Sequence, residues 1–132
     1  MTFAVDTNIL VRYLTWDDPA QATAAAALLE ADAPLWISTV VLCETVWVLR
    51  RGHKYTADEI ILAIQGLVAP QYIRVEDEEA MNAGFEALRK GADFADGCIL
   101  NISQRAGARP LITFDQKLGR AGGSSVRLLA SA

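Results

Sequence analysis

The sequence has 132 residues, with 12 Lys and Arg against 16 Asp and Glu, and a formal net charge of −4. Hydrophobic residues account for 52% of the chain and charged residues for 21%, which excludes intrinsic disorder and predicts one folded domain over residues 1–132. The acidic balance argues against a protein that binds nucleic acid through bulk positive charge, because phosphate neutralisation needs clustered Lys and Arg.

The predicted elements of the first half alternate between short apolar strands and helices. Residues typical of helix ends mark the boundaries: Asp18, Ser38 and Thr56 as N-caps, Pro19 at a first helical position and Gly52 after a last turn. In chain order we expect a strand at Thr2–Val5, a short helix at Thr7–Leu14, a helix from Pro19 to about Ala31, a strand at Leu35–Ile37, a helix at Thr39–Arg51 and a helix from Thr56 to about Val68.

The second half continues the same alternation. We expect a strand at Tyr72–Val75, a helix at Asp77–Lys90, a helix from Asp93 or Phe94 to Arg105 or Ala106, a strand at Pro110–Thr113, a short helical turn from Asp115, a loop over Gly119–Ser125 and a strand at Val126–Leu129. Five short apolar strands separated by helices predict an α/β domain whose mostly parallel sheet is covered on both faces. Ligands of such sheets bind outside the carboxyl ends of the strands, so acids that follow strands are the first candidates for a site.

Five acidic residues stand where such a site would form. Asp6 directly follows the first strand, and Asp115 follows the fourth. Glu44 shares a helical stripe with valines, so we expect it to face inward or into a cleft. Asp93 and Asp96 lie three residues apart at the start of a helix. Apart from Glu44, each also has a structural explanation as an N-cap, an Asx turn or a capping pair, and these explanations stay open.

Acids that converge in one place repel each other unless cations lie among them. Mg²⁺ or Mn²⁺ fits best, because both prefer hard oxygen ligands and the sequence offers no cluster of thiolates or imidazoles. Such ions lower the pKa of a bound water and stabilise the attacking and leaving oxygens of a phosphodiester. They would also supply the positive charge that the composition lacks.

Four segments, in order, resemble PIN-domain ribonucleases, specifically the VapC toxins of bacterial toxin–antitoxin pairs. The resemblance covers essentially the whole chain, and four acidic motifs in order are a far stronger signal than an Asp-Thr-Asn opening alone. The segments are Phe3–Leu14 with its Asp6-Thr7-Asn8 motif, Glu44 in its apolar helix, Asp93-Phe94-Ala95-Asp96, and Thr113-Phe114-Asp115.

The resemblance implies a three-layer α/β/α fold with strand order 3-2-1-4-5 and a Mg²⁺- or Mn²⁺-dependent endoribonuclease that hydrolyses RNA with metal-activated water. It further implies a homodimer and a VapB-type antitoxin as partner. We expect no membrane association, because no stretch of about 18 apolar residues lacks a charged or strongly polar residue. The residues that match the family are the metal-binding acids Asp6, Glu44, Asp96 and Asp115, with Asn8, Asp93 and Thr113 in supporting positions. The chain departs from the usual pattern at Gly97, because glycine in a first helical turn costs up to about 1 kcal/mol relative to alanine.

Basic and aromatic residues carry weaker signals. Arg50 and Arg51 end the helix that carries Glu44, and Arg12 and Lys117 lie near the predicted site in sequence. All four are candidate phosphate contacts, although the pair at 50 and 51 also suits a helix C-terminus. The three tryptophans are too dispersed to predict a stacking platform, so packing is the expected role.

Two other functions compete with the ribonuclease. The first is a catalytically inert PIN-fold binding module, which would lack at least one acid. The second is an aspartate-based phosphoryl-transfer domain, but its phosphatase signature needs a second Asp two residues after the first, where Asn8 stands. Asp6 interrupts the apolar N-terminal run before a signal-peptide core could form, so we expect a cytoplasmic protein with Cys43 and Cys98 as buried thiols.

Overall fold

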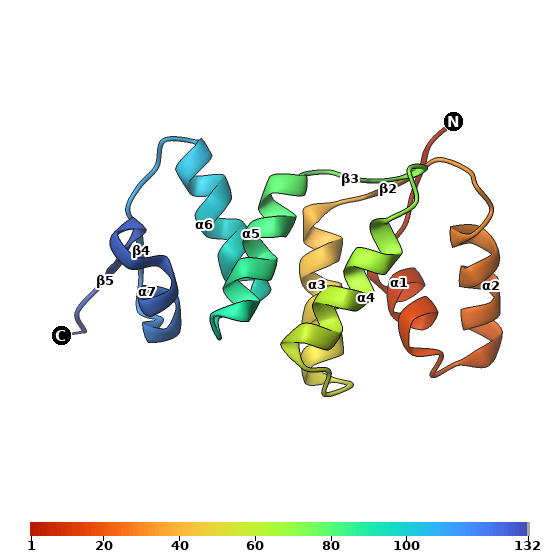
Figure 1. Cartoon of the computed structure of the whole chain (residues 1–132), viewed down its shortest axis with the longest axis horizontal. Coiled ribbons are helices and arrows are strands. Elements are labelled where there is room, and N and C mark those ends of the chain that lie inside the picture. The colour runs from red at the N-terminus through yellow and green to blue at the C-terminus, as the bar shows by residue number, and fades with distance from the viewer. Residues whose placement is uncertain (132) are drawn as a thin grey trace. The chain divides into compact units, whose positions relative to one another are not determined.

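The computed structural model describes residues 1–131, which fold as two compact units: Met1–Asp77, and the part that begins at Glu78. Each unit combines short parallel strands with helices (Figure 1). The predicted mixed α/β class with parallel strands is therefore confirmed. The single domain expected over residues 1–132 stays a prediction.

The first unit contains a three-stranded parallel sheet in which β2 lies between β1 and β3. Phe3 pairs with Leu35, and Leu35 in turn pairs with Ile73, as the predicted order 3-2-1 requires. Leu35 and Ile37 of the central strand are fully buried, as expected for a parallel strand. The elements are β1 (Phe3–Ala4), α1 (Thr7–Thr15), α2 (Pro19–Leu29), β2 (Leu35–Ile37), α3 (Thr39–Arg51), α4 (Ala57–Val68) and β3 (Ile73–Val75).

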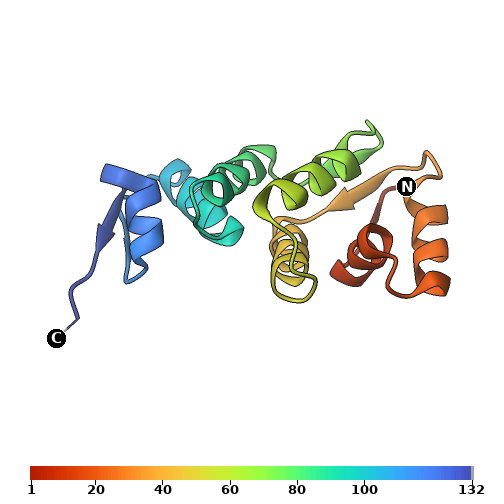
Figure 2. The same cartoon turned by 60° about the horizontal axis from the view of Figure 1, so that its bottom comes forward.

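Side-chain caps start the helices of this unit where the sequence predicts them. Asp18 accepts a hydrogen bond from the Gln21 backbone N–H and caps α2. Ser38 caps α3 in the same way. Thr56 and Glu59 form both bonds of a capping box on α4. Helices α1 and α2 lie side by side (Figures 1 and 2), and apolar residues from all four helices form the core, among them Leu10, Leu29, Leu42, Leu49, Ile60 and Ile64.

The second unit contains two packed helices followed by a two-stranded parallel sheet. β4 pairs with β5, with Leu111 opposite Val126, as the predicted order 4-5 requires. The β1–β4 pairing that would join all five strands into one sheet stays a prediction, because the described strands pair as sets of three and two. The elements are α5 (Glu78–Arg89), α6 (Phe94–Arg105), β4 (Leu111–Thr113), α7 (Gln116–Gly122), the 3₁₀ turn η1 (Gly123–Ser125) and β5 (Val126–Leu128).

Glycines allow α5 and α6 to pack closely, and the two helices lie side by side in both views (Figures 1 and 2). A Cβ on Gly97 would lie 2.4 Å from the Ala83 carbonyl oxygen and 2.7 Å from the Ala87 Cβ. A Cβ on Gly84 would lie 2.5 Å from the ring of Phe94. Gly97, unfavourable by helix propensity alone, is thus required by the approach of α6 to α5.

The loop predicted over residues 119–125 is wrong, because α7 continues through Gly122 and a 3₁₀ turn follows. A Cβ on Gly122 would lie 2.2 Å from Cγ2 of Val126, and one on Gly119 would lie 3.0 Å from Cγ of Leu128. These glycines make room for β5 against α7. The two glycines indicated a loop in the sequence, but they are needed because a larger side chain would not fit beside β5. Local helix propensity does not reveal such a packing requirement.

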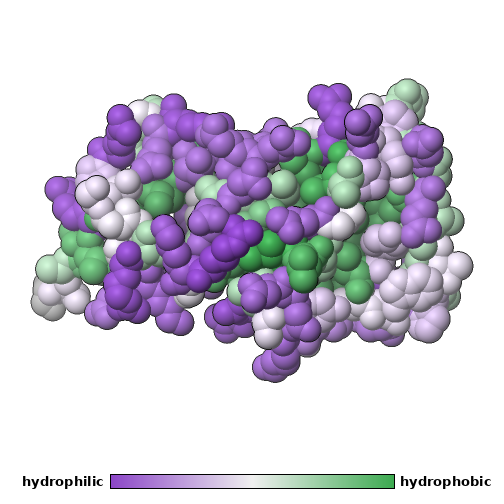
Figure 3. Space-filling view, viewed as in Figure 1, coloured by the Kyte–Doolittle hydropathy of each residue, from purple (hydrophilic) through white to green (hydrophobic). Residues whose placement is uncertain are grey.

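The two cysteines differ in how deeply they are buried. Cys98 is buried and its thiol donates to the Ala80 carbonyl oxygen at 3.3 Å, whereas Cys43 is half-buried. Within residues 1–131, no helix is both long enough and apolar enough to cross a membrane. Hydrophobic surface lies among hydrophilic patches on the face drawn in Figure 3. The exposed large apolar side chains include Trp16, Val40, Trp47 and Leu62 in the first unit and Ile99, Ile112, Phe114 and Leu128 in the second.

Candidate functional site

Asp6 lies between the carboxyl end of β1 and the start of α1. Its backbone is extended, and its Oδ1 accepts a hydrogen bond from the Ile9 backbone N–H at 3.3 Å. The N-cap explanation for Asp6 is therefore confirmed. Capping also fixes the direction of the carboxylate, so it does not compete with a role at the sheet edge.

Glu44 of α3 is linked to α1 by a side-chain hydrogen bond. The Thr7 hydroxyl donates to Glu44 Oε1 at 2.9 Å. Glu44 is exposed, and Val40 one turn earlier is 68% exposed, so an inward-facing position for this stripe is wrong. The alternative, a glutamate that faces a cleft, agrees with the structure, because Glu44 lines an open cavity.

Asp6 and Glu44 line one open cavity of about 660 Å³ in the first unit. The structure therefore brings these two predicted acids, together with Asn8, to the same place. Because Thr7 bonds to Glu44 and follows Asp6 directly, the start of α1 positions both carboxylates. The full lining is Asp6, Thr7, Asn8, Cys43, Glu44, Trp47 and Val48.

The predicted acids of the second unit lie at two helix starts. Asp93 is the N-cap residue of α6 but its side chain makes no capping hydrogen bond, and Asp96 lies in the first turn. Asp115 caps α7, where its Oδ1 accepts from the backbone N–H groups of Lys117 at 2.9 Å and Leu118 at 3.2 Å. The capping explanation thus holds for Asp115, but no side-chain cap bond supports it for Asp93. The Thr113 hydroxyl accepts from the Asp115 backbone N–H at 3.0 Å and fixes the turn after β4.

Asp96 experiences the electrostatic field of its acidic neighbours. Its side chain is half-buried, and this burial, followed by the negative charges of Asp93 and Asp115, raises the pKa of Asp96 above its ordinary value of 3.8. The charges of Asp93 and Asp115 are therefore close enough to disfavour ionisation of Asp96. A cation beside them would remove that cost.

The donor set fits a hard divalent ion. The candidate ligands in both units are carboxylates, with hydroxyl and amide oxygens of Thr7 and Asn8 nearby in the first, and such oxygens suit Mg²⁺ or Mn²⁺. Within residues 1–131, neither unit gathers three or more His, Cys, Asp or Glu side chains in an arrangement that could hold a metal ion. The fit thus rests on ligand chemistry and on the repulsion around Asp96.

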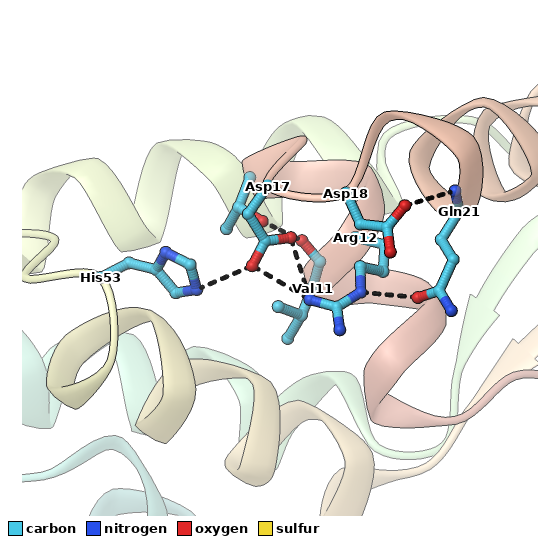
Figure 4. A network of polar contacts seen from close by, with 7 residues as sticks. Val11, Arg12, Asp17, Asp18, Gln21 and His53 are labelled. Carbon is cyan, nitrogen blue, oxygen red and sulfur yellow. Dashed lines mark hydrogen bonds and ion pairs between the residues drawn. The ribbon is translucent and has the colours of Figure 1, made fainter.

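Arg12, predicted as a phosphate contact, belongs to a polar network at the end of α1 (Figure 4). Its Nη1 lies 2.9 and 3.0 Å from the two carboxylate oxygens of Asp17, and its Nε donates to Gln21 Oε1 at 2.7 Å. His53 Nε2 lies 3.7 Å from the same aspartate. Desolvation opposes the shift, but hydrogen bonds from Thr15 and Arg12 and the charge of Arg12 lower the pKa of Asp17. The structure therefore gives Arg12 a structural partner, and phosphate binding by it stays a prediction.

The other predicted basic contacts are exposed. Arg50 and Arg51 lie in the last turn of α3, and Lys117 lies in the first turn of α7. Sequence reasoning missed Trp47, which lines the cavity of Asp6 and Glu44. Its position three residues after Glu44 on a helix was the available signal, because such residues are neighbours on the helix surface.

The sequence matches the PIN domain over residues 3–124. The chain belongs to the PIN-domain family. None of the curated proteins compared matches it. PIN domains are generally nucleases that use divalent metal ions, and the matched range of this PIN domain includes Asp6, Glu44, Asp96 and Asp115. Membership in this family therefore makes the hydrolysis of nucleic acid the general chemistry of the fold.

Proposed function

We propose that this PIN domain is a Mg²⁺- or Mn²⁺-dependent endoribonuclease that acts as the cytoplasmic toxin of a VapBC-type toxin–antitoxin pair. The observation that carries the proposal is the half-buried Asp96 in the field of Asp93 and Asp115, because this arrangement is costly without a cation. The resemblance of the four acidic segments to VapC toxins supports the choice of RNA as substrate.

By this proposal, Asp6, Glu44, Asp96 and Asp115 supply the carboxylates that hold the metal. When bound, the divalent ion lowers the pKa of a water molecule and stabilises charge on the scissile phosphate. The chain itself orients the ligands. The Thr7 hydroxyl holds Glu44, backbone N–H groups hold Asp6 and Asp115, and the Thr113 hydroxyl fixes the turn that precedes Asp115.

The retained acids favour an enzyme over an inert binding module. Loss of one ligand is the change expected in a PIN fold that only binds a partner, and all four positions carry Asp or Glu. A homodimer and a VapB-type antitoxin are the protein partners that the same resemblance supports. A small gene for a DNA-binding protein directly upstream of this one would favour the toxin role.

The test of the enzyme is cleavage of a structured RNA by the purified protein without antitoxin. We expect cutting with Mg²⁺ or Mn²⁺ and none in excess EDTA. Asp6→Asn and Asp96→Asn should each reduce the rate at least about 100-fold, which corresponds to about 2.7 kcal/mol of lost transition-state stabilisation, while the circular dichroism spectrum stays unchanged.

Asp32→Asn is the matched control, because Asp32 is an exposed aspartate outside the predicted site. Its φ of 57° is a left-handed conformation that asparagine also tolerates, so this variant should fold and cut like the parent protein. Full activity in EDTA, or in both site variants, contradicts the proposal. Sequencing the 5′ ends of RNA after induction in cells would then identify the RNA that is cut.

A further inference from the structure

Trp47 is a large aromatic side chain on the wall of the cavity that contains Asp6 and Glu44. It is 62% exposed, although an indole carries an apolar surface that folding normally buries. We propose that the Trp47 indole stacks on a nucleobase of a single-stranded RNA segment next to the acids. This inference rests on the proposed function and deepens it, because it makes unpaired nucleotides the part of the RNA that this cavity binds.

The helical geometry places the indole beside a candidate metal ligand. Glu44, Trp47 and Val48 occupy positions i, i+3 and i+4 of α3, and side chains at these spacings are neighbours about 5–6 Å apart at Cβ. A base stacked on the indole would therefore lie next to this candidate metal ligand. The hydrogen bond from Thr7 to Glu44 keeps this side of the cavity in place.

The other residues of the cavity fit a base better than they fit a phosphate. The two carboxylates repel an anion, whereas a nucleobase is uncharged and presents a π face to the indole. Val48 adds apolar surface, and the Asn8 amide offers one acceptor and two donors for a base edge. A stacking surface of this kind accepts any base, so it selects single strands and not a sequence.

The other tryptophans do not share this position. Trp16 is 49% exposed, but it is the C-cap residue of α1 and is not among the residues that line the cavity. Trp36 lies on the central strand β2 and is half-buried. Trp16 is therefore a matched control: an exposed tryptophan of the same unit outside the cavity.

The first experiment measures binding without cutting. Fluorescence anisotropy follows a labelled single-stranded oligoribonucleotide of mixed sequence with the full chain in Mg²⁺, in an Asp96→Asn background. We expect Trp47→Ala to weaken binding about tenfold or more, Trp47→Phe to retain most of it, and Trp16→Ala to leave it unchanged. Equal affinity of the Trp47→Ala and Trp16→Ala proteins, or no binding by the parent, overturns the inference.

The second experiment asks whether the indole contacts a base. Single abasic sites are introduced along the oligonucleotide. At one position the loss of the base should weaken binding by the parent about as much as Trp47→Ala does, and combining the two changes should cost no more than either alone. If the abasic site and Trp47→Ala weaken binding independently at every position, so that their fold-losses of affinity multiply, the inference is overturned.

A third measurement separates stacking on RNA from a contact between proteins. Light scattering compares the oligomeric state of the Trp47→Ala protein with that of the parent, and we expect no difference. If the variant changes from dimer to monomer as it loses RNA binding, the indole is a subunit contact and the inference is wrong. None of these binding measurements requires cleavage, so failure to cut any RNA would count against the proposed function alone.

Discussion

The two units hold their carboxylates in different ways. In the first, Asp6 and Glu44 each accept a hydrogen bond from a group on α1, and both face one cavity. In the second, burial, followed by the charges of Asp93 and Asp115, raises the pKa of Asp96. Hydrogen bonds thus position Asp6 and Glu44 in the first unit and Asp115 in the second, whereas only the second unit holds a half-buried carboxylate, Asp96, whose ionisation burial and two acids disfavour.

The helices of the two units also differ in how they use glycine. Gly66 of α4 has nothing within 4 Å of the place where its Cβ would be. At Gly97 of α6 the same atom would lie 2.4 Å from a backbone carbonyl oxygen. Glycine is therefore a local cost in the first unit and a packing requirement in the second.

The largest expected effects are those of substituting Asp96 and Glu44, and the two substitutions should differ in their effect on stability. Asp96→Asn and Glu44→Gln should both abolish cutting, with losses of at least about 100-fold, but they should differ in stability in EDTA at pH 7. Asp96→Asn should raise the Tm because it removes a charge that burial and two acids disfavour. Glu44→Gln keeps an oxygen that can accept from Thr7, so its Tm should stay close to the parent's.

The sign of the pH dependence follows from the raised pKa of Asp96. The folded state binds this proton more tightly than the unfolded state, so the parent protein is more stable with the group protonated and loses that stability as pH rises from about 3.8 through the folded pKa. The Tm advantage of Asp96→Asn should therefore shrink as pH falls through the folded pKa towards 3.8, and should not change further below that value. A lower Tm for the variant at pH 7 would contradict the assigned repulsion.

Paired glycine substitutions test the second contrast. Gly97→Ala should destabilise the protein by about 1–3 kcal/mol, because the new methyl group overlaps backbone and side-chain atoms of α5. Gly66→Ala should stabilise it by about 0.5–1 kcal/mol, since alanine favours the helix and nothing is nearby. Urea unfolding at pH 7 measures both changes. Changes of the same sign would show that the two helices do not differ in this way.

The smallest effect concerns the capping box of α4, a local feature of the first unit. Thr56→Ala should cost about 1 kcal/mol in urea unfolding, because it removes the acceptor for the Glu59 backbone N–H. The hydrogen bond from the Thr56 backbone, followed by that with its side chain, lowers the pKa of Glu59. A lowered pKa stabilises the fold above the ordinary value of 4.5, and this contribution is lost as pH falls through the folded pKa.

Glu59→Gln is the matching variant, since it removes the titrating group and keeps an acceptor. Between pH 3 and 5, the free energy of unfolding of this variant should depend less on pH than that of the parent protein. An identical dependence on pH between 3 and 5 would show that the capping carboxylate does not contribute to stability.

Prediction from the sequence succeeded where a few neighbouring residues decide the outcome. Ser38 and Thr56 start their helices by bonds to residues three positions away, so the local pattern contains the cause. The short apolar runs likewise predicted parallel strands, and the resemblance to PIN domains implied the orders 3-2-1 and 4-5. Prediction failed for the end of α7, because Gly122 is required by contact with Val126 and does not break the helix.

For the candidate site too, the sequence predicted the features that depend on neighbouring residues but not those that depend on distant ones. Asp6 and Asp115 were predicted from their positions after strands, and both cap the helices that follow. Glu44 was expected on the strength of an apolar stripe, but its exposure depends on what α3 packs against. Its partner Thr7 is 37 residues away, a separation at which no local pattern indicates a contact.

The sequence by itself determined the identity and order of the acids, the helix starts and the family, because all of these are encoded in residue type and short spacing. Tertiary structure decided which side chains share a cavity, which glycines are required and which acids repel each other. These properties depend on distances between segments far apart in the chain. Most of α6 and all of β4 separate Asp96 from Asp115 in the sequence. The charge of Asp115 contributes to the raised pKa of Asp96 only because the fold brings the two side chains together.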